Sequence, residues 1–145
     1  MPEKVFAYIT HGNNFLVFSH PDFPEAGLQV PAGTMEVGET PETAVMREAF
    51  EETGLTNLRL QGCLGSLVCD LSAWGGDAVQ TRHFFHLEQE GDTPSTWRHD
   101  ETCGGTSEPS VFEFFWVSLP DGVPDLIAGH GQMLPALIAR NYQKP

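Results

Sequence analysis

Residues 33–55 read GTMEVGETPETAVMREAFEETGL, and this stretch contains a helix with clear boundaries. Thr40 is a good N-cap residue, and Pro41 is favoured at the first helical position. Gly54 suits the position just beyond a helix end, because glycine readily adopts the left-handed backbone conformation found there. The sequence therefore predicts a helix over residues 41–53.

The predicted helix has an apolar side and an acidic side when its residues are placed about 100° apart around the axis. The apolar residues, which suit packing on a sheet, are Val45, Met46, Ala49, Phe50 and Thr53. Glu48, Glu51 and Glu52 fall on the opposite side, where the small Ala44 leaves room. Carboxylates three and four residues apart repel each other by roughly 0.2 to 0.5 kcal/mol per pair in an isolated helix. The arrangement is unfavourable unless a positive charge lies beside it.

A hard divalent cation is the natural source of that positive charge. Mg²⁺ prefers carboxylate and water oxygens, and it typically takes one or two carboxylates together with substrate phosphates. No His or Cys lies among the three glutamates. An ordinary solvated helix face is the competing interpretation, and it is the usual one for clustered glutamates outside a motif.

The composition describes one acidic domain. The chain has 145 residues, of which 40% are hydrophobic, so we expect a single domain over residues 1–145 with one core. Seven basic and twenty acidic residues give a formal net charge of −13, which disfavours DNA or an anionic membrane as a partner. An anionic substrate would be repelled by this field, so divalent cations would have to reverse the local sign.

The cysteines and the apolar runs predict a cytoplasmic protein. Cys63, Cys69 and Cys103 are odd in number and lack the spacing of a zinc site or a disulfide framework. No segment resembles a signal peptide or approaches the roughly 18 apolar residues of a membrane span.

Several β-rich runs surround the helix. Residues 4–10 and 14–19, separated by His-Gly-Asn, predict a hairpin, and residues 28–30 predict a short strand stopped by Pro31. Residues 57–70 and 78–89 predict two long paired strands.

The last third of the chain is more varied. Residues 91–110 predict a long polar loop, and residues 111–119 predict an aromatic strand. Residues 125–141 predict a helical region that becomes regular only after Gly131.

The stretch over residues 33–55 resembles a complete Nudix box, G-x5-E-x7-R-E-U-x-E-E-x-G-U, where U is a bulky aliphatic residue. The seven fixed positions are filled by Gly33, Glu39, Arg47, Glu48, Glu51, Glu52 and Gly54. Such a match arises by chance on the order of 10⁻⁸ times per window at typical residue frequencies. Ala49 is a slight departure, because the pattern asks for a bulkier residue there.

The resemblance implies an α/β (α+β) fold, a Nudix-like α/β/α sandwich with a mixed β-sheet between helices. It implies a Mg²⁺- or Mn²⁺-dependent pyrophosphohydrolase that cleaves a nucleoside diphosphate linked to a group X. The products would be a nucleoside monophosphate and phosphorylated X, or pyrophosphate when the substrate is a nucleoside triphosphate. The expected partner is thus a small-molecule nucleotide, and a homodimer is left open.

The resemblance also assigns roles by position. Glu48, Glu51 and Glu52 correspond to the metal ligands, with the backbone carbonyl of Ala32 as a further candidate ligand. The general base differs among members of the family, and here Glu52 or Glu48 is the first choice. The distal alternatives are Asp100, Glu101 and Glu108.

The remaining positions of the box have supporting roles. Arg47 corresponds to the family arginine that holds one of the carboxylates in place, and we count it with the catalytic set. Glu39 would support the loop and the start of the helix, where the helix dipole favours a carboxylate. Gly33 and Gly38 would let the loop fold back over the helix.

The substrate is narrowed only by elimination. No proline lies between Pro41 and Pro94, and the only tyrosines are Tyr8 and Tyr142. The downstream proline of ADP-ribose hydrolases and the downstream tyrosine of diadenosine polyphosphate hydrolases are therefore missing. A nucleoside triphosphate or a small nucleotide derivative remains.

Two other functions stay open beside the enzyme. A noncatalytic Nudix-like sensor or regulator would bind a nucleotide without cleaving it, although the box has lost none of its glutamates. The hypothesis of messenger RNA decapping is less favoured, because seven basic residues offer little positively charged surface for binding the body of an RNA.

Overall fold

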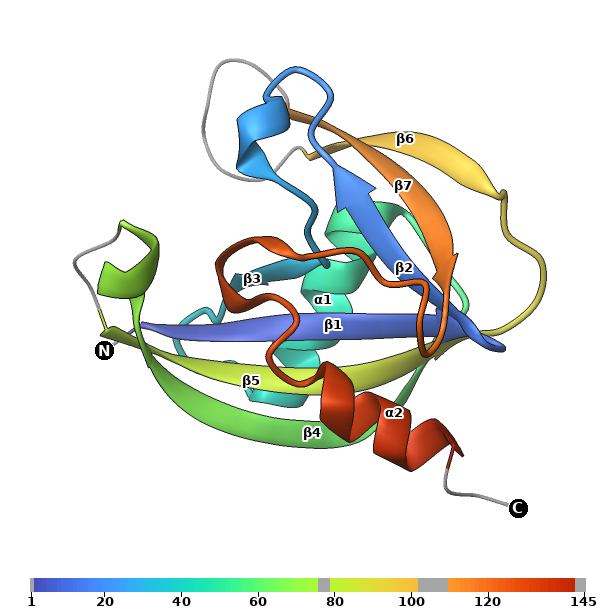
Figure 1. Ribbon diagram of the computed structural model, residues 1–145. Coiled ribbons are helices and arrows are strands. Elements are labelled where there is room, and N and C mark those ends of the chain that lie inside the picture. The colour runs from blue at the N-terminus through green and yellow to red at the C-terminus, as the bar shows by residue number, and fades with distance from the viewer. Residues whose placement is uncertain (1, 76–78, 102–109, 143–145) are drawn as a thin grey trace.

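Strand β1 (Glu3–His11) lies at the centre of a seven-stranded mixed sheet in the computed structural model (Figure 1), which describes residues 2–75, 79–101 and 110–142. One edge of β1 pairs in parallel with β5 (Val79–Gln89). Its other edge is shared by two antiparallel strands, β3 (Ala32–Thr34) near its start and β2 (Asn14–Ser19) at its end. Strands β2 and β3 thus pair with different parts of the same edge of β1.

The sheet continues outward from these neighbours. Strand β4 (Leu58–Asp70) pairs antiparallel with β5 and forms one edge of the sheet. On the other side, β7 (Ser110–Ser118) pairs with β2, and β6 (Thr96–Glu101) pairs with β7 as the opposite edge. The predicted hairpin and the two long paired strands are confirmed.

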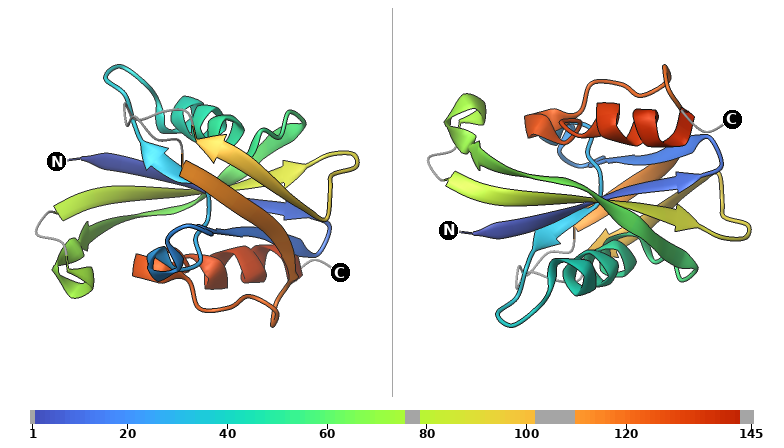
Figure 2. Two further views of the ribbon diagram at one scale, coloured as in Figure 1. Left: turned by 90° about the horizontal axis from the view of Figure 1, so that it is seen from above. Right: turned by 90° about the horizontal axis from the view of Figure 1, so that it is seen from below.

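Two helices cover the two faces of the sheet (Figure 2). Helix α1 (Pro41–Thr53) lies on one face, and helix α2 (Leu134–Tyr142) lies on the other. Each face has its own core: Val45 and Ala49 of α1 belong to one buried cluster, and Leu137 of α2 belongs to the other. This is the predicted α/β/α sandwich with a mixed sheet between helices.

Helix α1 begins and ends where its sequence predicts. The side chain of Thr40 accepts a hydrogen bond from the backbone N–H of Thr43 at 3.2 Å. Gly54 has a φ of 76°, and its N–H donates to the carbonyl of Phe50 at 2.8 Å. Local capping chemistry is sufficient to set both ends of this helix.

The buried side of α1 differs from the predicted apolar stripe. Phe50 is 53% exposed, whereas Ala44 is fully buried in the core and Glu52 is only 4% exposed. The reason is that α1 packs against β3 and β6 as well as against the central strands. A helical wheel built for a single flat contact cannot include these additional neighbours.

Two other sequence predictions are wrong. Residues 28–30 form only an isolated bridge from Gln29 to Phe18, and the strand begins at Ala32. Residues 91–110 are not a continuous loop, because they include β6, whose Trp97 and His99 contact the end of α1. The pattern TWRHDE has too few apolar residues to predict a strand by alternation.

The segment before α2 is a tight turn. A short 3₁₀ helix, η3 (Ile127–Gly129), comes first, and α2 is regular only after Gly131, as predicted. The buried hydroxyl of Tyr8 donates to the carbonyl of His130 at 2.6 Å and accepts from the N–H of Met133 at 3.1 Å. The side chain of Tyr8 in β1 therefore anchors both ends of the turn, at His130 and at Met133.

Two further features concern the cysteines and the length of the helices. Within the described ranges, Cys63 is an exposed free thiol and Cys69 is a buried one, while Cys103 lies outside those ranges. None of the helices in the described part of the chain is long and apolar enough to cross a membrane.

Replacement of Leu137 tests how α2 is docked. Leu137→Ala should lower the free energy of unfolding by about 2–5 kcal/mol, because the side chain is fully buried and its removal leaves a cavity. Denaturant titration measures the loss, and Ile138→Ala, at a partly buried position, should cost less. Equal and small losses in both variants would show that Leu137 does not dock the helix.

Candidate active site

The loop between β3 and α1 is closed by Glu39. Its N–H donates to the carbonyl of Glu36 at 3.1 Å, and its carboxylate accepts from the N–H of Glu36 at 2.9 Å. Gly38 between them has a φ of 82°, which glycine adopts without strain. The loop therefore turns back so that the Glu39 carboxylate faces the helix.

Arg47 lies at the centre of the box carboxylates. Its Nε and Nη2 donate to the two oxygens of Glu39 at 2.7 and 2.9 Å, a bidentate pair. Its Nη1 donates to Glu48 at 2.9 Å and to Glu51 at 3.2 Å. Nη2 also reaches the carbonyl of Thr34 at 3.3 Å. One guanidinium thus joins the end of β3, the loop and two turns of α1.

These contacts shift the pKa values of both partners. The hydrogen bonds from Arg47 and then from the Glu36 N–H lower the pKa of Glu39 to about 2. The same carboxylate, and after it that of Glu48, raises the pKa of Arg47 above its already high ordinary value. Both groups are therefore charged over the whole physiological range.

Glu52 is held from a different direction. Its carboxylate is buried and accepts a hydrogen bond from the N–H of Ala32 at 3.0 Å. In an extended strand the N–H and the C=O of one residue point to the same side. The carbonyl of Ala32 therefore faces away from β1, toward the side on which Glu52 lies.

Glu48 lies directly against the backbone of Gly33. A Cβ added to Gly33 would overlap the carboxylate of Glu48, so only glycine leaves room for this approach. The close contact explains why the first position of the box is glycine.

The distal candidates are only partly placed. Strand β6 lies over the C-terminal end of α1, where Nε2 of His99 is 3.0 Å from the carbonyl of Glu51 and Nε1 of Trp97 donates to the carbonyl of Thr53 at 2.9 Å. Asp100 and Glu101 end this strand. Glu108 lies outside the described residues.

Sequence reasoning missed the contribution of His99 and Trp97. Both side chains hold the carbonyl end of the box helix in place. Their spacing of two residues, which puts them on one face of a strand, is the signal that could have found them.

The donor set fits a hard divalent cation. Glu48, Glu51 and Glu52 supply carboxylate oxygens, Ala32 supplies a carbonyl, and these are the ligand types that Mg²⁺ and Mn²⁺ prefer. Within the described part of the chain, no three His, Cys, Asp or Glu side chains are gathered closely enough to surround an ion. The guanidinium of Arg47 is instead the group on which two of these carboxylates converge.

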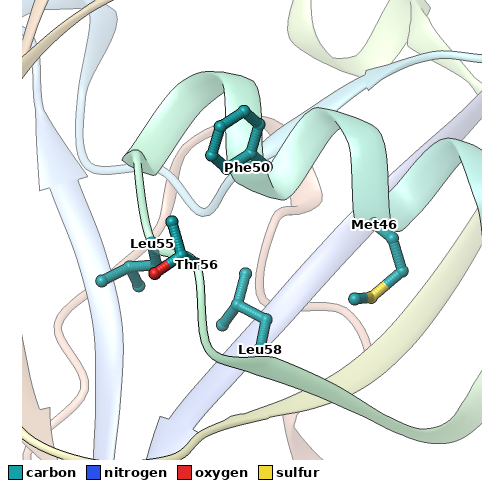
Figure 3. A pocket seen from close by; sticks show the side chains of 5 residues that line it. All are labelled: Met46, Phe50, Leu55, Thr56 and Leu58. Carbon is teal, nitrogen blue, oxygen red and sulfur yellow. The ribbon is translucent and has the colours of Figure 1, made fainter.

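Two hollows of the surface lie along α1 without a box carboxylate in their lining. A groove of about 230 Å³ between α1 and β4 is lined by Met46, Phe50, Leu55, Thr56 and Leu58 (Figure 3). It contains none of the box carboxylates. A second hollow of about 320 Å³ lies at the end of α1 beside Trp97, whose indole stacks on Phe114 at 5.2 Å.

A sequence model of the NUDIX domain matches residues 2–137, which is almost the whole described chain and includes the box. The chain belongs to the Nudix family. Dependence on a divalent metal is typical of this family. No curated protein matches the sequence.

Solved structures share the fold at low sequence identity. A UDP-X diphosphatase superposes with a TM-score of 0.63 at 20% identity, covering 98% of this chain and 63% of that one. An ADP-ribose pyrophosphatase from Streptococcus suis gives 0.62 at 20% identity, covering 99% and 94%. A bifunctional NMN adenylyltransferase/ADP ribose pyrophosphatase from Francisella tularensis, complexed with AMP and a manganese ion, gives 0.60 at 20% identity, covering 97% and 42%. The chain thus spans less than two thirds of the length of the first and the last of these.

The charge of Glu39 should contribute to stability only above acidic pH. Its folded pKa of about 2 lies below the ordinary 4.5, so the contribution is complete above about pH 4.5 and is lost as the pH falls toward 2. We expect the difference in unfolding free energy between the native chain and Glu39→Gln to shrink over that interval. A difference that does not vary with pH would contradict the ion pair.

Enlargement of Gly33 tests the placement of Glu48. Gly33→Ala should displace the Glu48 carboxylate, which is the flexible end of its side chain, and leave the backbone in place. Hydrolysis should fall roughly tenfold to a hundredfold, as expected for a misplaced site group, with little change in melting temperature. Gly12→Ala is the control, because a Cβ added there would meet no other atom and the change costs only about 1 kcal/mol of backbone strain. Full activity in Gly33→Ala would mean that the observed Glu48 position is not the working one.

Proposed function

We propose that this Nudix hydrolase is a Mg²⁺- or Mn²⁺-dependent pyrophosphohydrolase of a nucleoside diphosphate linked to a group X. The products are a nucleoside monophosphate and phosphorylated X, or pyrophosphate when a nucleoside triphosphate is cleaved. The observation that carries the proposal is the Arg47 cluster. Arg47 holds Glu39, Glu48 and Glu51 together, and the Glu48 carboxylate lies against Gly33 of β3.

The metal ligands in this proposal are Glu48, Glu51 and Glu52, with the carbonyl of Ala32. A bound Mg²⁺ or Mn²⁺ would supply Lewis-acid stabilisation of the diphosphate oxygens and an activated water. The protein's part is to hold the ligands. The Ala32 N–H fixes Glu52, Arg47 limits the motion of Glu48 and Glu51, and Gly33 lets the Glu48 carboxylate approach the loop.

The charge of the chain supports a cation-dependent reaction. With a formal net charge of −13, the protein repels an anionic nucleotide unless cations reverse the field locally. Arg47 cannot do this alone, because its guanidinium is already engaged with Glu39, Glu48 and Glu51.

The general base is proposed among the carboxylates near α1. Glu52 or Glu48 remains the first choice, and Asp100, Glu101 and Glu108 are the distal alternatives. The end of β6 supports the distal set. His99 holds this strand close to the carbonyl of Glu51, and the next two residues along the strand are Asp100 and Glu101.

The substrate proposed is a nucleoside triphosphate or a small nucleotide derivative, not DNA. Structural neighbours named for ADP-ribose, for UDP-X and for dihydroneopterin triphosphate support a diphosphate linkage as the reacting group. The missing downstream proline and tyrosine argue against ADP-ribose and diadenosine polyphosphates. We place the chain in the cytoplasm as a single domain over residues 1–145, with a homodimer left open.

A hydrolysis screen tests the proposal. Nucleoside triphosphates, including oxidised ones, nucleotide sugars, ADP-ribose and dinucleoside polyphosphates are incubated with the protein and Mg²⁺ or Mn²⁺. Glu52→Gln keeps the size of the side chain and an oxygen for the Ala32 N–H but removes the charge. Turnover should fall by a factor on the order of 10² or more, because a metal contributes several kcal/mol to the barrier.

Two controls accompany the screen. Glu42→Gln, at an exposed position on the same helix, should keep full activity, and a chelator should abolish both hydrolysis and nucleotide binding. Near-native turnover in Glu52→Gln would overturn the metal assignment. Metal-dependent nucleotide binding without any cleavage across the panel would identify a sensor.

A further inference from the structure

The imidazole of His130 connects the C-terminal turn to the segment that leads into β3. The backbone N–H of Val30 donates to Nδ1 of His130 at 3.1 Å, although the two residues are 100 positions apart. Beside this bond, the N–H of Ile127 donates to the carbonyl of Leu28 at 2.9 Å. Two bonds from the α2 side of the sheet thus hold residues that precede the box.

The position of His130 is itself well determined. Its carbonyl accepts from the hydroxyl of Tyr8 at 2.6 Å, and its ring stands edge-on to Phe6 at 5.1 Å between centroids. Burial, followed by the charges of Arg82 and Lys4, lowers the pKa of His130 to about 4. The ring is therefore neutral at physiological pH, with Nδ1 as the acceptor for Val30.

Three successive residues are each tied to a different part of the fold. The N–H of Val30 bonds to His130, the carbonyl of Pro31 accepts from Ala7 of β1 at 2.8 Å, and the N–H of Ala32 bonds to Glu52 of α1 at 3.0 Å. Val30 is fully buried, and the ring of Pro31 fixes one of the backbone torsions between Val30 and Ala32. The chain from Val30 to Ala32 is therefore short and restrained at both ends.

We infer that His130 is a positioning residue for the metal site: through Val30 and Pro31 it sets the place of Ala32, whose N–H holds Glu52. The inference rests on the proposed function, because it concerns the affinity of the Glu52 and Ala32 oxygens for Mg²⁺ or Mn²⁺. The contacts described for His130 are with Phe6, Tyr8 and Val30, none of which is a proposed metal ligand. It acts from the opposite face of the sheet.

Two substitutions separate the hydrogen bond from the bulk of the ring. His130→Phe keeps a flat ring of similar size against Phe6 but removes the acceptor for the Val30 N–H. His130→Asn places a carboxamide oxygen near the position of Nδ1 and can accept the same bond. Leu137→Ala is the matched control, because it destabilises the buried cluster that contains Val30 but leaves the hydrogen-bond acceptor for the Val30 N–H in place.

Two readouts are independent of catalysis. The first is amide hydrogen exchange of Ala32 in metal-free protein, relative to the amides of β1 and β5. The second is the dissociation constant for Mn²⁺ without nucleotide, measured by calorimetry. In His130→Phe both should change by on the order of tenfold, with faster exchange at Ala32 and weaker Mn²⁺ binding, the size typical of groups that orient metal ligands. His130→Asn should restore both to within about threefold, and Leu137→Ala should change neither.

The possible outcomes are distinct. If His130→Phe lowers the melting temperature but leaves Ala32 exchange and Mn²⁺ affinity unchanged, His130 only stabilises the fold and the inference is wrong. The same holds if His130→Asn fails to restore what His130→Phe loses. If the native chain binds Mn²⁺ but cleaves no nucleotide, the proposed function fails while these two readouts still decide the inference. If the native chain binds no Mn²⁺, both fail together.

Discussion

The contact of one guanidinium with three carboxylates is the interaction on which the rest of this site depends. Like charges three and four residues apart on α1 repel one another, and Glu39 adds a further negative charge. Arg47 reverses this balance because charge-assisted hydrogen bonds are roughly twice as strong as neutral ones, and it makes four of them. Arg47 therefore offsets the repulsion on the acidic side of the helix, and its hydrogen bonds join the loop, β3 and α1 there.

The carboxylates are held from several layers of the sandwich at once. Arg47 acts within α1 and its preceding loop, whereas Glu52 is fixed by β3, and β6 holds the carbonyl end of the helix. The turn before α2 contributes from the far side through Val30. Because these contacts come from distant parts of the sequence, the box alone does not make the site, although it supplies most of the charged groups.

How much of this could be predicted depends on the range of the forces involved. Helix α1 was predicted to the residue because Thr40 and Gly54 act locally, and the long strands were predicted from their β-rich composition. The burial of Glu52 and the exposure of Phe50 could not be predicted, since both depend on strands that the helical wheel ignores. Strand β6 exists because β7 and the end of α1 provide partners for a polar sequence. The chemical roles of the box residues stay a prediction, as does the identity of the base.

The placement of β1 between strands from both halves of the chain bears on the order of folding. Its hairpin partner β2 follows at once, but its parallel neighbour β5 belongs to the second half of the chain. During synthesis one edge of a very apolar strand therefore waits unpaired, and such edges favour association between chains. Since His130 emerges later still, the segment before the box receives this restraint only after the residues of α1 and β5 have been synthesised. The residues of the acidic helix are thus synthesised before those that hold the helix in place from the other face of the sheet.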